Sequence, residues 1–284
     1  MECIGHRRKA EMKHGARVCT LCLAAACACA LSATAVLAAP CAAPDTLTRV
    51  SGGDECLIIR TWRGSGAASP RTLYVLLHGN HSSGSPATSQ FAVAAALAAQ
   101  GGANAVAVAL IRPGYNDADG NHSSGNSAGR GDNFTALNID IVAAALVTLK
   151  AFHRADRLVL VGHSGGAAMA GVTLGRHPGL ADAAVLVGCP CDVPAWRAGR
   201  GRRDLWLSES ASHYVDRIPL QSRIAVIVGR KDEVTAPSLS ERYVADLRLR
   251  GIAATLTLID EGDHNNVIAA PAVLAEALRL GRGD

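Results

Sequence analysis

The sequence predicts an α/β fold with a mostly parallel central sheet flanked by helices. Short apolar runs recur along the chain, and several lack polar alternation, which is typical of strands buried on both faces of a parallel sheet. Segments of helical length separate these runs, and such alternation predicts a sheet covered by helices. The chain has 284 residues, 49% of them hydrophobic, enough to bury a full core. Ligands of such sheets bind where the strands end.

The N-terminal 39 residues have the pattern of an export signal. A basic segment ending at Arg17 precedes an uncharged, alanine-rich run that closes with AVLAAP. A basic start, an apolar middle and small residues at a cleavage site define a secretory signal peptide. We expect a signal over residues 1–39, starting at Met1 or Met12, and a secreted or periplasmic mature chain, 40–284, without stable membrane insertion. An uncleaved anchor helix is the alternative.

The mature chain carries little net charge, which argues against nucleic acid as a partner. Without residues 1–39 the formal charge falls from +4 to +1, and aromatic residues make up only 4% of the chain. Nucleic-acid binding requires a basic face, usually with aromatic stacking positions. Four cysteines remain in this part, Cys41, Cys56, Cys189 and Cys191, and all three of their pairings stay open. Their spacing does not match a zinc motif, so no metal is expected.

Seven apolar segments are the expected strands. They are 57–62, 73–77, 105–111, 158–161, 183–187, 224–228 and 254–259. The later ones are apolar on both faces, which predicts burial on both sides of the sheet. The expected helices are 88–100, 134–153, 165–176, 238–250 and 266–280.

Two long polar stretches interrupt this alternation, and long loops in a compact domain are usually functional or disordered. The first, 113–133, is rich in Gly, Ser, Asn and Asp. The second, 189–219, predicts a short cap-like insertion whose Trp196, Trp206 and Tyr214 shape a substrate pocket.

The pattern G-x-S-x-G marks two serines and cannot by itself choose between them. It occurs as GNSAG around Ser127 and as GHSGG around Ser164. A nucleophilic serine needs exposure on a sharp turn between a strand and a helix, with a backbone N–H beside it. Ser164 follows an expected strand and precedes an expected helix, whereas loop residues flank Ser127. The sequence therefore predicts Ser164 as the nucleophile.

Together with GHSGG, three further segments resemble the α/β-hydrolase superfamily, over nearly all of residues 50–284. HGN at 78–80 resembles the family's oxyanion loop, GRKDEV at 229–234 its acid loop, and DHN at 263–265 its histidine loop. Each segment follows an expected strand, in the family's order. The chain most resembles the dienelactone-hydrolase-like and prolyl-oligopeptidase-like branches, which contain esterases and peptidases.

The resemblance implies a serine hydrolase that works through an acyl-enzyme without a cofactor. Ser164 would attack, His264 would carry the proton, and Asp232 would orient the imidazole. The backbone N–H groups of Asn80 and Gly165 would form the oxyanion hole.

Neighbouring titratable residues are expected to have other roles. Asp263 is poorly placed to reach round to the ring of the histidine that follows it, and Glu233 lies off the family's acid position. His78 and His163 are interpreted as supporting residues, and His153 is expected at the surface.

Three functions remain open at this stage. The leading one is hydrolysis of small carboxylic esters. The second is cleavage of short peptides, since RPGYNDADGNHSSG resembles loops of aminopeptidase-like members, and Asp117 or Asp119 would then bind the peptide amine. The third is a non-catalytic binding protein on the same fold. The oligomeric state is left open.

Overall fold

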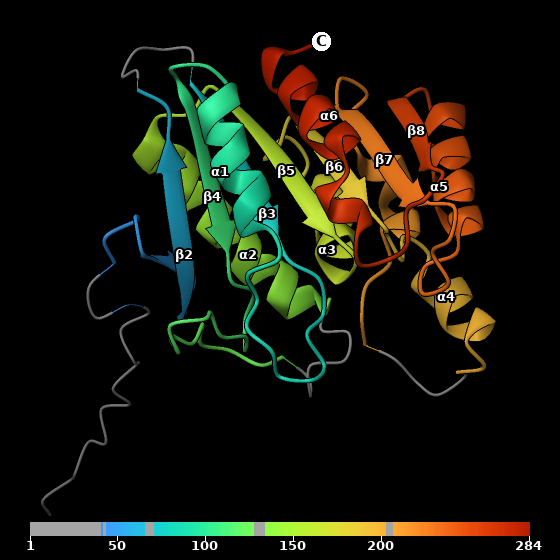
Figure 1. Cartoon of the computed structure of the whole chain (residues 1–284), viewed down its shortest axis with the longest axis horizontal. Coiled ribbons are helices and arrows are strands. Elements are labelled where there is room, and N and C mark those ends of the chain that lie inside the picture. Colours follow the sequence, from blue (N-terminus) through green and yellow to red (C-terminus); the bar gives the residue numbers. More distant parts are fainter. Residues whose placement is uncertain (1–40, 42–43, 66–70, 128–133, 203–206) are drawn as a thin grey trace, which may run out of the picture. The chain divides into compact units, whose positions relative to one another are not determined.

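Figure 1 shows a computed structural model of the chain. The structure describes residues 41, 44–65, 71–127, 134–202 and 207–284. The signal expected over residues 1–39 and the predicted pocket residue Trp206 lie outside the described residues.

The core is an eight-stranded sheet in the order β1-β2-β4-β3-β5-β6-β7-β8. Its strands are β1 (Arg49–Gly52), β2 (Glu55–Arg63), β3 (Thr72–Leu77), β4 (Ala105–Leu110), β5 (Arg157–His163), β6 (Ala183–Val187), β7 (Arg223–Gly229) and β8 (Ala253–Ile259). The strand β2 pairs antiparallel with β1 and β4, and all other neighbours pair parallel. The predicted mostly parallel sheet is confirmed.

The position of each strand in the sheet explains its burial. All residues of β4 and β6 are buried, as expected for strands covered on both faces. The prediction of two buried faces is wrong for β8, which has exposed and half-buried residues because it forms one edge of the sheet. The sequence does not predict the short edge strand β1, since its four residues carry little apolar pattern.

Helices cover both faces of the sheet. They are α1 (Phe91–Gln100), α2 (Ala136–His153), α3 (Gly165–Arg176), α4 (Val193–Gly199), α5 (Pro237–Leu249) and α6 (Pro271–Arg282), with two short 3-10 helices, η2 (Ala211–Arg217) and η3 (Val267–Ala269). Helices α1 and α6 share one apolar cluster with the sheet, and α2, α3 and α5 share the other. In Figure 1, α1 and α6 lie in front of the sheet.

The expected helix over 266–280 is divided into η3 and α6, because Pro271 cannot continue a preceding helix and instead begins the next one.

Among the described residues, α2 alone is long and apolar enough by composition to cross a membrane. Half of this helix is buried against the body of the fold, which accounts for its apolar character.

The insertion over 189–219 has two parts with different surroundings. The helix η2 packs on α3, where the backbone of Tyr214 lies so close to Gly175 that a methyl group there would approach its carbonyl to 2.5 Å. Tyr214 is therefore part of the core and not a pocket residue. In α4, the indole N–H of Trp196 donates to the carbonyl of Val234 at 2.7 Å, so this helix contacts the loop after β7.

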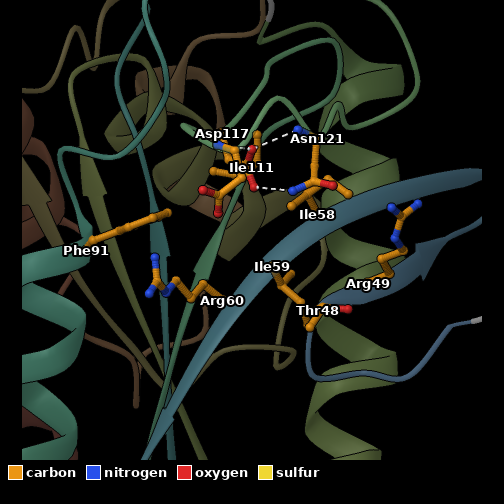
Figure 2. Close-up of a pocket in the computed structure, with 10 residues that line it drawn as sticks. Thr48, Arg49, Ile58, Ile59, Arg60, Phe91, Ile111, Asp117 and Asn121 are labelled. Carbon is orange, nitrogen blue, oxygen red and sulfur yellow. Dashed lines mark hydrogen bonds between the residues drawn. The ribbon is translucent and has the colours of Figure 1, made fainter.

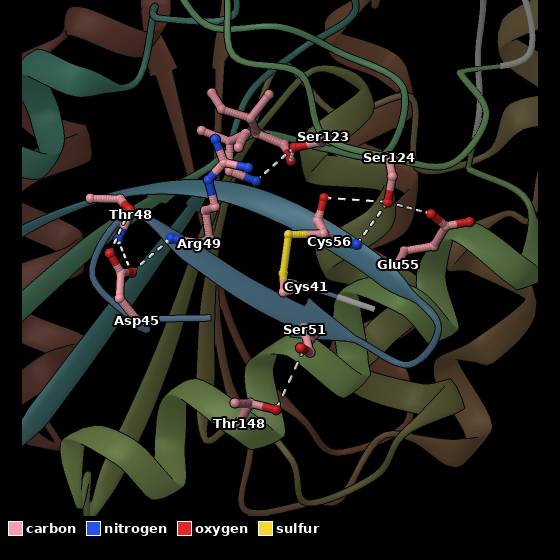
Figure 3. Close-up of a disulfide and its surroundings, with 12 residues drawn as sticks. Cys41, Asp45, Thr48, Arg49, Ser51, Glu55, Cys56, Ser123, Ser124 and Thr148 are labelled. Carbon is pink, nitrogen blue, oxygen red and sulfur yellow. Dashed lines mark hydrogen bonds between the residues drawn. A yellow bond between two sulfur atoms is a disulfide. The ribbon is translucent and has the colours of Figure 1, made fainter. Parts of the chain in front are cut away.

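Two disulfides pair the four cysteines of this part of the chain. Cys41–Cys56 ties the segment before β1 to β2 (Figure 3), and Cys189–Cys191 closes a turn just after β6. A cross-link spanning 15 residues stabilises the fold by about 3 kcal/mol in the chain-entropy account. It fixes the β1–β2 hairpin, where Ser124 also accepts a bond from the backbone N–H of Cys56.

Candidate active site

Ser164 occupies a strained turn between β5 and α3. Its φ of 52° and ψ of −120° lie in a region that non-glycine residues rarely adopt. Neighbouring glycines make this turn sterically feasible, because a methyl group on Gly166 would lie 2.2 Å from the carbonyl oxygen of Leu77, and one on Gly162 2.4 Å from that of Gly166. The turn therefore has the strand–serine–helix geometry that places a nucleophile at the end of a sheet.

The structure brings Ser164, His264 and Asp232 together from the ends of three strands. His264 Nε2 lies 2.9 Å from Ser164 Oγ, and His264 Nδ1 lies 2.9 Å from Asp232 Oδ2. The side chain of Asp232 is fully buried and that of His264 is 11% exposed. A hydroxyl, an imidazole and a carboxylate in a continuous hydrogen-bonded chain can move the hydroxyl proton to the imidazole.

Asp232 is held as a carboxylate by four donors. Its Oδ1 accepts from the backbone N–H groups of Val234 and Thr235 at 2.9 and 2.7 Å. Its Oδ2 accepts from the hydroxyl of Thr235 at 2.8 Å as well as from His264. Burial by itself raises the pKa of this carboxyl, but the bonds from His264 and Thr235 outweigh it and the pKa is lowered.

Thr235 is a site residue that the sequence reasoning missed. Its hydroxyl also lies 3.1 Å from His264 Nδ1, so it contacts both partners of the hydrogen bond between Asp232 and His264. The sequence contains one indication of this role, because Thr235 follows Asp232 by three positions in a turn. At this spacing a hydroxyl residue can hydrogen-bond back to the aspartate. The competing acids lie elsewhere: Glu233 is exposed, and Asp263 Oδ1 accepts from the N–H groups of Asn265 and Asn266 in its own turn.

Asn80 and Gly165, the residues whose backbone N–H groups are expected to form the oxyanion hole, lie next to each other at the Ser164 turn. Within the described part of the chain neither N–H has a hydrogen-bond acceptor, as expected for Gly165 in the first turn of α3. A methyl group on Gly79 would approach Ser164 Cβ to 3.1 Å, and one on Gly165 would approach Asn80 Oδ1 to 2.4 Å. The loop after β3 thus packs directly against the turn that carries Ser164.

Two buried histidines hold the loops around Ser164. His78 Nδ1 donates to the carbonyl of Gly79 at 2.7 Å, and its Nε2 accepts from the backbone N–H of Arg112 at 2.9 Å. His163 Nε2 donates to the carbonyl of His264 at 2.8 Å. Desolvation lowers the pKa of both rings, that of His163 to about 4. Both are therefore neutral at pH 7, and their bonds agree with the supporting roles expected for them.

The second serine motif lies in a different setting. Ser127 belongs to the loop after β4, where its backbone nitrogen would be 2.3 Å from a methyl group on Gly114. The carbonyl of the preceding Asn126 accepts from the side chain of Asn138 at 2.8 Å. No strand leads directly into this motif in the described structure.

Asp117 and Asp119 lie at a separate cavity of about 350 Å³ (Figure 2). Its lining includes Arg49, Arg60 and Phe91 and none of Ser164, Asp232 or His264. Asp117 Oδ1 accepts from the N–H groups of Asp119 and Asn121, and its Oδ2 accepts from the Asn121 side chain. The carboxylate of Asp117 is therefore engaged within its own loop.

The described residues contain no cluster of His, Cys, Asp or Glu suited to a metal ion. The fold and the serine turn at the end of β5 define an α/β-hydrolase-fold serine hydrolase. The model of the prolyl oligopeptidase family matches residues 126–279. The chain belongs to this family.

Solved structures with the same fold include esterases and peptidases. Est1E from Butyrivibrio proteoclasticus, solved with ferulic acid bound, is 13% identical, with a TM-score of 0.60 over 82% of this chain and 96% of that one. Esterase Pf2001 from Pyrococcus furiosus is 17% identical, with a TM-score of 0.62 over 83% and 87%. An acylaminoacyl peptidase from Pyrococcus horikoshii is 14% identical, with a TM-score of 0.59 over 82% of this chain but 39% of its own. No curated protein matches the chain.

Buried histidines predict that stability falls in mild acid. His153, expected at the surface, is buried at 2% exposure, because it lies at the end of α2 against the body of the fold. Desolvation lowers its pKa, like that of His163, to about 4 from 6.5. Between these pH values the unfolded chain binds more protons, so the stability present above pH 6.5 is lost as pH falls toward 4.

Urea unfolding checks this pH dependence. The free energy of unfolding is expected to be lower at about pH 5 than at about pH 7, because the unfolded histidines protonate in that interval. His153→Gln should reduce this difference in unfolding free energy between the two pH values, because the variant lacks the contribution of His153. Equal pH dependence in the variant and the unmodified protein would show that His153 does not titrate as described.

Proposed function

We propose that the protein hydrolyses carboxylic esters through a covalent acyl-enzyme, with Ser164 as nucleophile, His264 as general base and acid, and Asp232 as the group that orients His264. The observation that carries the proposal is the hydrogen-bonded chain from Ser164 Oγ through His264 to Asp232, with distances of 2.9 Å at both contacts. A serine alone is a weak nucleophile, and an adjacent imidazole base activates it.

The reaction proceeds in two halves. Ser164 Oγ bonds to the carbonyl carbon as its proton passes to His264 Nε2, and the bond to the leaving alcohol then breaks as Nε2 returns the proton to that oxygen. Water subsequently attacks the acyl-enzyme by the same route and releases the acid. Asp232 stabilises the imidazolium that forms in each half, and its four donors keep it ionised for this purpose.

The backbone N–H groups of Gly165 and Asn80 would bind the oxyanion of the tetrahedral intermediate. Asn80 and Gly165 adjoin each other at the Ser164 turn, and neither N–H has another acceptor among the described residues. One such donor typically contributes about 3 kcal/mol to transition-state stabilisation.

The placement of the loop acids supports esters over free peptides. A peptidase that removes N-terminal residues needs a carboxylate for the substrate amine, and Asp117 and Asp119 were the candidates. Asp117 is engaged within its own loop, and both residues line a cavity that does not include Ser164. Peptide hydrolysis is the second candidate function, because the chain belongs to the prolyl oligopeptidase family.

We also propose that the chain is exported, with residues 1–39 removed as a signal. The two disulfides support an oxidising compartment, since such bonds persist in secreted and periplasmic proteins. The mass of the protein recovered from the exported fraction tests this, and retention of residues 1–39 would contradict cleavage.

A substrate panel separates the two candidate activities. The mature protein is expected to hydrolyse p-nitrophenyl acetate and butyrate with kcat/KM at least about 100-fold above that for aminoacyl p-nitroanilides and N-blocked peptide anilides. The control is Ser164→Ala, which should abolish every activity that belongs to this site. Faster cleavage of anilides than of esters by the unmodified protein would assign peptidase activity instead.

A further inference from the structure

Arg112 is a fully buried cation directly after β4, with 0% exposure. Burying a guanidinium is costly unless hydrogen bonds compensate for the lost water. Its Nη1 donates to the carbonyl of His78 at 2.9 Å and to Asn80 Oδ1 at 3.1 Å, and its backbone N–H donates to His78 Nε2 at 2.9 Å. Three bonds therefore fix Arg112 to the loop that carries the proposed oxyanion donor.

The guanidinium also lies next to the start of α3. A methyl group on Gly165 would come within 3.0 Å of Arg112 Nη1 and within 2.4 Å of Asn80 Oδ1. The Asn80 carboxamide oxygen and the Arg112 guanidinium thus both lie against the turn that carries Ser164. Both oxyanion donors, Gly165 and Asn80, are in the immediate surroundings of this charge.

The environment strengthens the electrostatic effect of Arg112. Its guanidinium carbon lies 5.1 Å from the ring centre of Tyr115 and 5.9 Å from that of Phe134, which shield it from water. A charge in such surroundings acts over a lower effective dielectric than one in solvent. The adjacent His78 is neutral because burial and the Arg112 charge both lower its pKa, so the positive charge at this position belongs to Arg112.

We propose that Arg112 is a positioning residue of the oxyanion hole, which fixes the Asn80 N–H beside Ser164 and whose buried positive charge stabilises the negative charge that develops on the substrate oxygen. Arg112 exchanges no proton and forms no covalent bond in this role. The inference rests on the proposed function, because it concerns the transition state of the Ser164 reaction.

Three variants separate position from charge. Arg112→Gln removes the charge, and we expect kcat for p-nitrophenyl acetate to fall about 100-fold with KM changed less than about threefold, equivalent to about 2.7 kcal/mol of transition-state stabilisation. Arg112→Lys keeps the charge but cannot reproduce the guanidinium's bonds to both His78 and Asn80. We expect its kcat to fall about 10-fold. Asn80→Asp keeps an acceptor for Arg112 Nη1, but its carboxylate neutralises the guanidinium charge. We expect kcat of this variant to fall about as far as that of Arg112→Gln.

The matched control is Arg176→Gln, at the opposite end of α3. Arg176 forms an ion pair with Asp140 at 2.7 Å. This variant therefore also removes one positive charge, but at the end of α3 that is remote from Ser164. Its kcat should stay within about twofold of the unmodified value. A trifluoromethyl ketone inhibitor, which forms an anionic adduct with the serine, provides a second readout. Its Ki should rise in Arg112→Gln by the same factor as kcat/KM falls, which a merely structural role would not produce.

The outcomes are distinguishable. Normal kcat in Arg112→Gln and Asn80→Asp, or a ketone Ki that does not follow kcat/KM, would overturn the role of Arg112 while leaving the proposed function intact. An unmodified protein without esterase activity would overturn the proposed function itself. If Arg112→Gln fails to fold, as judged by its thermal transition, kcat and the ketone Ki of Asn80→Asp test the role of Arg112, because this variant leaves the guanidinium in place.

Discussion

Replacing His264 with alanine is expected to lower kcat for aryl esters by about 10⁶-fold, the size of loss seen when a serine protease loses its base. The imidazole lies 2.9 Å from Ser164 Oγ, and within the described structure no other side chain hydrogen-bonds to this hydroxyl. Without it the hydroxyl keeps its proton, and the leaving alcohol has no acid to protonate it.

Steady-state kinetics with p-nitrophenyl acetate measure this effect. The matched control is His213→Ala, which removes an exposed imidazole from η2 and should change kcat less than about twofold. If the His264 variant kept more than about one tenth of the activity, His264 could not be the base.

Replacing Ser164 with alanine should cause a loss of similar size, because no acyl-enzyme can form. The chain supplies its own control, since Ser127 has the same sequence motif but lies in the loop after β4. Ser127→Ala should retain kcat within about threefold. The reverse result, loss in Ser127→Ala and activity in Ser164→Ala, would mean that the loop motif carries the nucleophile.

The sequence allowed the sheet and the grouping of Ser164, Asp232 and His264 to be anticipated, because both depend on local signals. Apolar runs of strand length locate the strands, and each of these three residues follows such a run. Parallel strands end at the same edge of the sheet, so residues far apart in the chain meet there. The 2.9 Å contacts at Ser164 and Asp232 agree with that reasoning.

Other features could not be anticipated because they depend on tertiary contacts. His153 is a polar residue at the end of the apolar helix α2, and tertiary packing buries it. Tyr214 is an aromatic residue in an irregular stretch, and only the fit of η2 on α3 places it in the core. Arg112 gave no sign of its position, since a buried arginine and an exposed one look alike in sequence. Its contacts with Asn80 exist only because β3 and β4 are neighbours in the sheet.

The most direct test of the central claim is to label the mature protein with a fluorophosphonate and to locate the adduct by peptide mass spectrometry. Such a probe reacts with a serine that a neighbouring base activates. We predict one stoichiometric adduct on the peptide that contains Ser164, and no adduct in Ser164→Ala. An adduct on Ser127, or no labelling of a folded preparation that hydrolyses esters, would contradict the assignment of Ser164 as the nucleophile.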